Sequence, residues 1–199
     1  QEEFPADGIL SEEGKDDLTR LDKDRVWIVD PLDGTREFGE PGRSDWAVHV
    51  ALAENGVPTA GAVALPALNA TLTTDPPAQL APPHDGRPRM VVSRSRPPAA
   101  AMIVAEAIGA ELFPLGSAGA KAMAVVLGHA DIYAHSGGQY EWDNCAPAAV
   151  ALAAGLHVSR CDGSALDYNY EDPWLPDLVI CRPEFAEDTL AALRRVIEG

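Results

Sequence analysis

The chain has 199 residues, 46% of them hydrophobic, which is long enough to bury a substantial core in one domain or two small ones. Fifteen basic and 31 acidic residues give a formal net charge of −16, which repels nucleic-acid phosphates and anionic lipid surfaces. Polymeric nucleic acid and membrane surfaces are therefore poor partners. The sequence also has no apolar run of about 18 residues, the length that predicts a membrane span.

Cysteine usage points to a reducing compartment. The three cysteines, an odd number, have no C-x-x-C spacing, which argues against both a zinc knuckle and a disulfide framework. No charged-then-apolar signal peptide stands at the start, so we expect a cytoplasmic protein. Because the chain begins with Gln1 and not with Met, a removed leader or an upstream segment remains open.

The first chemical signal is an acidic pair, Glu12 and Glu13, followed by a strand that ends in a second acidic motif. Residues 26–29 are β-branched and aromatic and predict a buried strand. It runs into residues 30–35, Asp-Pro-Leu-Asp-Gly-Thr, where Pro31 is expected to end the ladder. A glycine in this box can adopt a positive φ and turn successive backbone N–H groups toward an anion. The box can then place carboxylates that bind a cation next to backbone amides that bind a phosphate.

Three further strands are expected before the chain changes character. Residues 45–53 and 60–65 predict strands joined by a turn with Asn-Gly at its centre, and residues 70–74 predict another strand. Residues 75–88 contain five prolines and mark the best boundary in the chain. We therefore divide the chain into an antiparallel α+β half, residues 1–88, and a second half, residues 89–199.

The second half predicts alternating strands and alanine-rich helices, which is typical of an α/β arrangement. Its expected strands are residues 90–93, 131–134 and 177–181, and its expected helices are residues 99–109, 117–128, 143–154 and 184–198. The helix at 143 begins with a Trp-Asp step. Alone, Asp143 could simply cap that helix, and the box at residues 30–35 could be a strand end with an Asp-Gly turn.

The three acidic motifs together resemble the inositol monophosphatase superfamily, whose members share a Glu-Glu step, a D-P-[IL]-D-G-T box and a W-D helix start. The segments 9–13, 91–96 and 116–121 are most similar to the 3′(2′),5′-bisphosphate nucleotidase branch. The resemblance runs from residue 9 to about residue 180. It implies a layered α-β-α-β-α fold, of α+β and α/β character, with the active site between the two halves.

The resemblance implies two to three Mg²⁺ ions and assigns their ligands. Glu12, Asp30 and the backbone carbonyl of Leu32 are expected to bind the first ion. Asp30 bridges to a second ion, which Asp33 and Asp143 hold. Mg²⁺ prefers such oxygen ligands, and paired metal ions can activate water and stabilise a leaving oxygen.

The resemblance also implies which residues contact the substrate. The amides of Gly34 and Thr35 are expected to bind the phosphate, and the Thr35 hydroxyl to orient the attacking water. Glu13 is the expected base or a ligand of a weak third ion, and Asp33 is counted as catalytic. As ligands of the ions that bind the phosphate, four residues also border the substrate: Glu12, Leu32, Asp33 and Asp143.

Three cations are candidates for a second phosphate group on the substrate. Arg94 lies in a segment that is close to the nucleotide in the resembling branch, and Lys121 is expected to face the same cleft. Arg36 directly follows the phosphate-binding box. The alternative is that these are ordinary solvated surface cations. The five histidines form no metal-like cluster, and we assign them no chemistry.

The function implied by the resemblance is Mg²⁺-dependent removal of the 3′-phosphate from 3′-phosphoadenosine 5′-phosphate, or from its sulfated form, in sulfate assimilation. The product of the first reaction is AMP. An inositol-1-phosphatase or a fructose-1,6-bisphosphatase with the same metals is the enzymatic alternative. A metal- or phosphate-binding protein without catalysis is the other. The resemblance further implies inhibition by Li⁺ and by Ca²⁺, and a homodimer.

One departure from the family pattern is visible in the sequence. Family members carry a long N-terminal helical layer before the Glu-Glu step, whereas here only eleven residues precede Glu12. We therefore expect this layer to be missing or reduced. Apolar surface of the first sheet would then be exposed.

Overall fold

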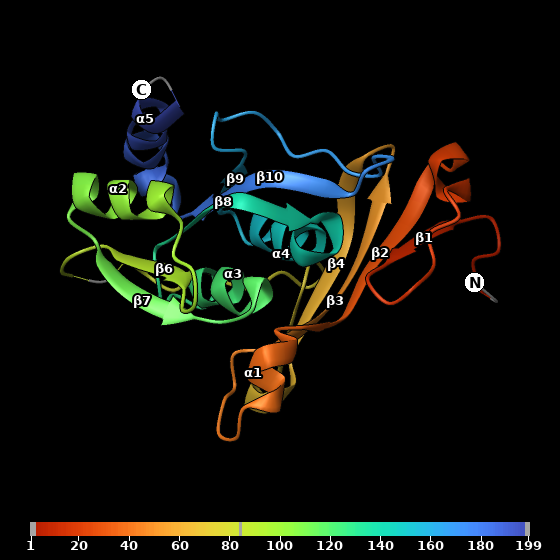
Figure 1. Ribbon diagram of the computed structural model, residues 1–199. Coiled ribbons are helices and arrows are strands. Elements are labelled where there is room, and N and C mark those ends of the chain that lie inside the picture. Colours follow the sequence, from red (N-terminus) through yellow and green to blue (C-terminus); the bar gives the residue numbers. More distant parts are fainter. Residues whose placement is uncertain (1–2, 84, 198–199) are drawn as a thin grey trace.

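The computed structural model describes residues 3–83 and 85–197, which fold around two five-stranded sheets (Figure 1). In the first sheet the spatial order follows the sequence, with β1 parallel to β2 and the other neighbours antiparallel. Its strands are β1 (Gly8–Ser11), β2 (Arg25–Asp33), β3 (Ala47–Glu54), β4 (Val57–Leu65) and β5 (Ala70–Thr73).

The second sheet has the order β7-β6-β8-β10-β9, in which β6 runs parallel to β7 and β8 and the remaining pairs are antiparallel. Its strands are β6 (Arg89–Ser93), β7 (Glu111–Leu115), β8 (Ile132–Tyr140), β9 (His157–Ser159) and β10 (Trp174–Cys181).

Two helices lie between the sheets and two cover the far side of the second sheet (Figure 1). The inner pair is α3 (Ala118–Val126) and α4 (Glu141–Ala153), and the outer pair is α2 (Ala99–Ile108) and α5 (Ala186–Ile197). A short helix, α1 (Thr35–Gly39), follows β2, and three 3₁₀ turns complete the described chain: η1 (Thr19–Asp22), η2 (Pro66–Leu68) and η3 (Pro183–Phe185).

The hydrophobic core shows why these layers form. Strand residues alternate between faces, so in β6 Val91 joins the core shared with the first sheet while Met90 and Val92 join the core under α2 and α5. The larger cluster contains residues of both sheets together with α3 and α4. The two halves are thus packed on one core, and a boundary at residue 88 stays a prediction. The expected layered fold of sheets and helices is confirmed.

The structure adds elements that the sequence analysis did not predict. It missed β1, β7, β9 and α1, all of them short. The sequence analysis also ended the expected strand at residue 134, but β8 continues to Tyr140. Gly137 and Gly138 adopt positive φ there, and pairing with β10 extends the strand past them. The expectation that Pro31 ends the ladder was wrong, because β2 regains its pairing at Asp33 after a register shift.

The outer face of the first sheet is partly exposed among the described residues. Ile9 is 45% exposed and Val50 is 37% exposed, while Trp27 and Val29 on the same face are half-buried. None of the described helices is both long and apolar enough to cross a membrane.

Candidate active site

Three carboxylates from different parts of the chain converge between the sheets. Asp30 and Asp33 lie on β2, on either side of the register shift, and Asp143 lies in the first turn of α4. One oxygen of each lies within 4.8 Å of the others. Asp30 and Asp33 are buried and Asp143 is half-buried. The structure therefore joins an acidic motif of the first half to one of the second.

The three carboxylates disturb one another's ionisation. Burial, and then the charge of Asp33, raises the pKa of Asp30 to about 8. The same two causes raise the pKa of Asp143 to about 6. Like charges in a buried site disfavour ionisation, and a cation among them would remove this penalty. The cluster offers only oxygen atoms, the donor set that suits Mg²⁺. The residues present therefore fit the expected metal.

Asp33 is held differently, because donors surround its carboxylate. Oδ2 accepts hydrogen bonds from the Ser117 hydroxyl at 2.5 Å and the Gly119 N–H at 2.7 Å, and Oδ1 accepts one from the Ala118 N–H at 3.3 Å. Burial would raise the pKa of Asp33, but contact with His49 and the bonds from Ser117 and Gly119 outweigh it and lower the pKa to about 2. The carboxylate also lies at the positive end of α3. Asp33 thus ties β2 to the second half of the molecule.

Glu12 lies beside the cluster on the segment after β1. A hydrogen bond with Glu12 contributes to the raised pKa of Asp30, and the Glu12 charge contributes to that of Asp143. Its N–H bonds to the Val29 carbonyl at 3.3 Å, which keeps the segment next to β2. Glu13 is exposed. The assignments of Glu12 as a ligand and of Glu13 as a base stay predictions.

The turn after β2 has the shape expected of the box. Gly34 has φ +86°, and a Cβ on it would lie 2.9 Å from the Ser117 Cβ, so only glycine fits. The Thr35 hydroxyl donates to the Leu32 carbonyl at 3.2 Å, and the Leu32 N–H bonds to Asp30 Oδ1 at 2.9 Å. Thr35 and Leu32 therefore lie together at the edge of the carboxylate cluster, while their roles toward water, metal and phosphate stay predictions.

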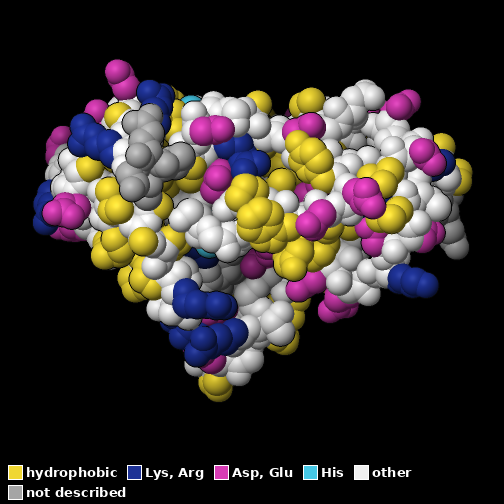
Figure 2. Space-filling view, turned by 45° about the horizontal axis from the view of Figure 1, so that its top comes forward, with side chains coloured by type: hydrophobic (Ala, Val, Ile, Leu, Met, Phe, Trp, Pro, Cys, Tyr) yellow, Lys and Arg dark blue, Asp and Glu magenta, His cyan; other side chains and the backbone are white. Residues whose placement is uncertain are grey.

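The three candidate cations all have partners within the chain. Arg94 donates to Glu37 Oε1 from Nε and Nη2, at 3.0 and 2.9 Å, and Nη2 also bonds to Glu40 at 2.7 Å. Arg36 forms an ion pair with Glu40 at 3.4 Å. Lys121 is buried, its Nζ donates to the carbonyls of Gly116 and Ser117, and burial lowers its pKa. The contacts of Arg94 attach α1 to the segment after β6, whereas binding of a second phosphate by any of the three cations stays a prediction. Figure 2 shows a group of Lys and Arg side chains in the lower part of the view, with others scattered over the same face.

Comparison with known proteins now places the chain. A sequence model of the inositol monophosphatase family matches residues 1–78 and 88–198. The chain belongs to the inositol monophosphatase family. It is 54% identical, over 97% of its length and 75% of the relative's, to a protein of Mycobacterium bovis named 3′-phosphoadenosine 5′-phosphate phosphatase. The chain is also 32% identical to the 3′(2′),5′-bisphosphate nucleotidase CysQ of Escherichia coli, over 76% of this chain and 65% of that protein.

The fold comparison agrees with this membership. A crystal structure of CysQ from Bacteroides thetaiotaomicron, described as a bacterial member of the inositol monophosphatase family, matches with a TM-score of 0.74 at 30% identity. The match covers 88% of this chain and 77% of that one. The resemblance found from the acidic motifs, including the bisphosphate nucleotidase branch, is confirmed.

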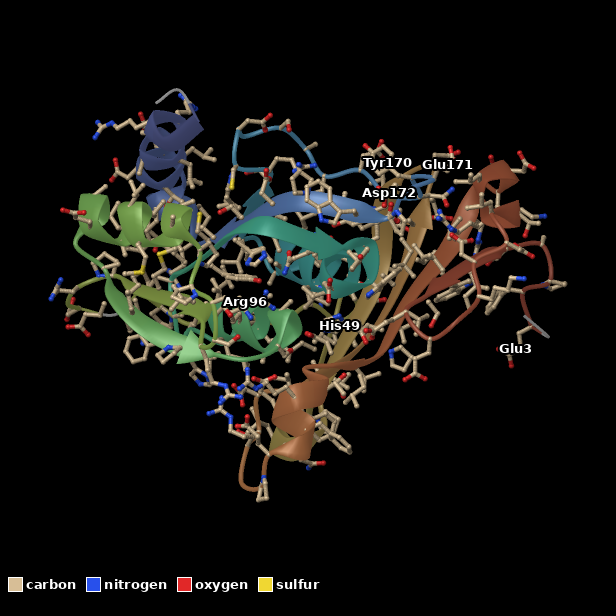
Figure 3. All side chains as sticks on the ribbon, viewed as in Figure 1. Glu3, His49, Arg96, Tyr170, Glu171 and Asp172 are labelled. Atoms are coloured by element: carbon tan, nitrogen blue, oxygen red, sulfur yellow. The ribbon has the colours of Figure 1, made fainter. Side chains whose placement is uncertain are left out.

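The structure also brings His49 into the site of this inositol monophosphatase family member, which the sequence analysis did not anticipate. His49 lies on β3 below α4 (Figure 3), where its Nε2 is 3.3 Å from Asp33 Oδ2. Burial would lower the pKa of His49, but the contact with Asp33 outweighs it and raises the pKa. The signal that could have found it is the strand register, in which His49 stands opposite Asp30. A single sequence does not give that register.

A cavity of about 400 Å³ opens between the end of β6 and the middle of β8. Its polar lining comes from Ser93, Ser95, Arg96, His135 and Ser136. The volume lies in the range of small-molecule sites. The segment 91–96, which was singled out for its similarity to the nucleotidase branch, therefore contributes one wall of a cavity.

Proposed function

We propose that the chain is a Mg²⁺-dependent phosphomonoesterase that removes the 3′-phosphate of 3′-phosphoadenosine 5′-phosphate, and of its sulfated form, in sulfate assimilation. The observation that carries this proposal is the cluster of Asp30, Asp33 and Asp143, two buried carboxylates and one half-buried carboxylate whose oxygens lie within 4.8 Å of one another and that match the acidic motifs of a phosphatase family. The names of the relatives support the substrate.

In the proposed mechanism the ions are held by Asp30, Asp33 and Asp143, with Glu12 and the Leu32 carbonyl completing the set. When bound, Mg²⁺ would neutralise phosphate charge and promote attack by water. The chain contributes orientation: the Thr35 hydroxyl is 3.2 Å from the Leu32 carbonyl and can turn toward the attacking water. The amides of Gly34 and Thr35 bind the phosphate oxygens, and Glu13 accepts the proton of the attacking water. As the water oxygen bonds to phosphorus, the bond from phosphorus to the 3′ oxygen breaks, and that oxygen takes up a proton and leaves as the 3′ hydroxyl.

The second phosphate of the substrate is proposed to bind near the cavity at the end of β6. A molecule with a net charge of −16 needs local cations to hold a bisphosphate. Arg94 and Lys121 stay our proposed contacts, together with Arg36, although each already has partners in the chain. We further propose that the enzyme is cytoplasmic and forms a homodimer.

Phosphate release tests the reaction. The chain is incubated with 3′-phosphoadenosine 5′-phosphate, inositol 1-phosphate or fructose 1,6-bisphosphate, each with Mg²⁺ or with EDTA. We expect release from the first substrate only with Mg²⁺, loss of release in Asp143→Asn, and inhibition by Li⁺ and Ca²⁺. A tenfold preference for inositol 1-phosphate, on the order of 1.4 kcal/mol, would overturn the substrate assignment. No release from any substrate would favour a metal- or phosphate-binding protein without catalysis.

A further inference from the structure

His49 stands between two of the carboxylates and has no role in the proposed mechanism. Its side chain is 0% exposed. On one side Nδ1 lies 2.9 Å from the carbonyl oxygen of Trp142, the residue directly before Asp143. On the other side Nε2 lies 3.3 Å from Asp33 Oδ2. The imidazole ring therefore spans from β2 to the first turn of α4.

The His49 ring packs closely against Gly119 at the start of α3. A Cβ on Gly119 would lie 2.0 Å from Nε2 and 2.9 Å from Cε1 of His49, so the ring occupies space that only a glycine leaves free. The Gly119 N–H also bonds to Asp33 Oδ2, the oxygen that faces His49. Gly119 thus brings the start of α3 against both residues, and the ring and the carboxylate are fixed together.

A rigid ring between two elements fixes the distance between them. The atoms of imidazole share one plane with no internal torsion, so its two nitrogens keep a fixed separation that sets the span between the groups they contact. Asp33 and the backbone at Trp142 are held at that separation, and Asp143 follows Trp142 in the same helical turn. Mg²⁺ demands near-ideal octahedral geometry, which makes its affinity sensitive to the spacing of its ligands.

We propose that His49 is a positioning residue that holds Asp33 against the first turn of α4, so that the carboxylates of Asp33 and Asp143 keep the spacing that Mg²⁺ requires. The inference rests on the proposed metal site. It assigns His49 no contact with substrate or metal. Residues that orient metal ligands in this way affect metal affinity by about 10- to 100-fold when they are replaced.

The test is Mg²⁺ binding to the metal-free full chain, measured by isothermal titration calorimetry, with thermal unfolding in EDTA as a second readout. His49→Phe keeps a planar ring but removes both nitrogens, and we expect its Kd for Mg²⁺ to rise by about 10- to 100-fold. His49→Gln, whose amide can reach toward Asp33, should recover part of the affinity. Phosphatase activity of His49→Phe should be regained at high Mg²⁺. The Mg²⁺ concentration needed for half-maximal activity should rise by a larger factor than kcat falls.

The matched control is Val150→Ala, a fully buried position of α4 that weakens packing without touching a carboxylate. It should lower the unfolding temperature in EDTA and leave the Kd for Mg²⁺ unchanged. Equal Mg²⁺ affinity in His49→Phe and the wild type would overturn the proposal, as would an equal loss in the control. If His49→Phe does not fold, the smaller His49→Asn, which loses the reach to Asp33, takes its place with the same expectation.

These outcomes separate the inference from the proposed function. A wild type that binds Mg²⁺ and releases phosphate, beside a His49→Phe variant of equal affinity, would overturn the role of His49 alone. A wild type that binds no Mg²⁺ would overturn both the positioning role and the metal-dependent mechanism.

Discussion

Replacing Gly61 tests how α4 is placed against the first sheet. A Cβ at this position of β4 would lie 2.9 Å from the Ala149 Cβ and 3.3 Å from the Ala146 carbonyl oxygen, both on α4. Carbon atoms pack best at about 3.5–4.0 Å, so Gly61→Ala requires the two elements to separate by about 0.6–1.1 Å. Overpacking of a core by one methyl group costs about 1–3 kcal/mol.

The measurement is thermal unfolding in EDTA. For a domain of this size about 1 kcal/mol corresponds to about 2–4 °C, so the unfolding temperature of Gly61→Ala should fall by about 2–12 °C. Mg²⁺ affinity should fall as well, because α4 carries Asp143. Gly39→Ala is the matched control: no atom lies within 4 Å of the added Cβ, so stability should be unchanged or slightly higher.

The result that would refute the reasoning is a Gly61→Ala variant as stable as the wild type. It would mean that α4 does not approach β4 at the distance described, or that it moves away without loss of packing. Equal destabilisation of Gly39→Ala would also contradict the argument, because the effect would then come from losing a glycine and not from the contact with α4.

Three further outcomes follow from buried charges. The pKa of Asp30, about 8, is above its unfolded value of 3.8, so the metal-free protein should lose stability as pH rises from about 4 to 8; denaturant titrations should show this loss disappearing in Asp30→Asn. The pKa of Asp33, about 2, is below the same unfolded value of 3.8, so ionised Asp33 contributes about 2 kcal/mol to the free energy of unfolding. This contribution should be present above about pH 4 and vanish toward pH 2, and Asp33→Asn should remove the dependence. Arg20 is 1% exposed and donates to Asp16 and Asn169, so urea unfolding of Arg20→Met should show a loss of about 1.5–3 kcal/mol, and an unchanged midpoint would contradict a stabilising role.

The acidic motifs could be predicted because each is local in the sequence. Asp30 and Asp33 are three residues apart at the end of an apolar strand, and Asp143 opens an alanine-rich helix, so the residue types and their order already indicate a metal site. Their convergence followed from the resemblance and not from spacing. Nothing in the residues alone places α4 against β2.

The contacts that the sequence could not predict are those set by strand register and by partner choice. His49 joins the site because β3 pairs with β2 in one register, and a shift of one residue would turn it to the outer face. Arg94 was predicted to meet a phosphate, but its Nε and Nη2 already bond to Glu37 and Glu40, more than fifty residues earlier in the chain. A sequence shows a cation without showing which carboxylate reaches it.

The metal site and the stability of the fold are linked through the same carboxylates. Asp30 and Asp143 carry raised pKa values because burial and the charge of Asp33 oppose their ionisation, so the ion-free site destabilises the folded chain at neutral pH. The unfolded chain does not hold these groups together. A cation that binds only the folded form adds about 2.7 kcal/mol of stability at 100 times its Kd. Because the proposed ligands come from β2 and α4, this gain would act on the packing of the two halves, and Mg²⁺ should stabilise the whole molecule.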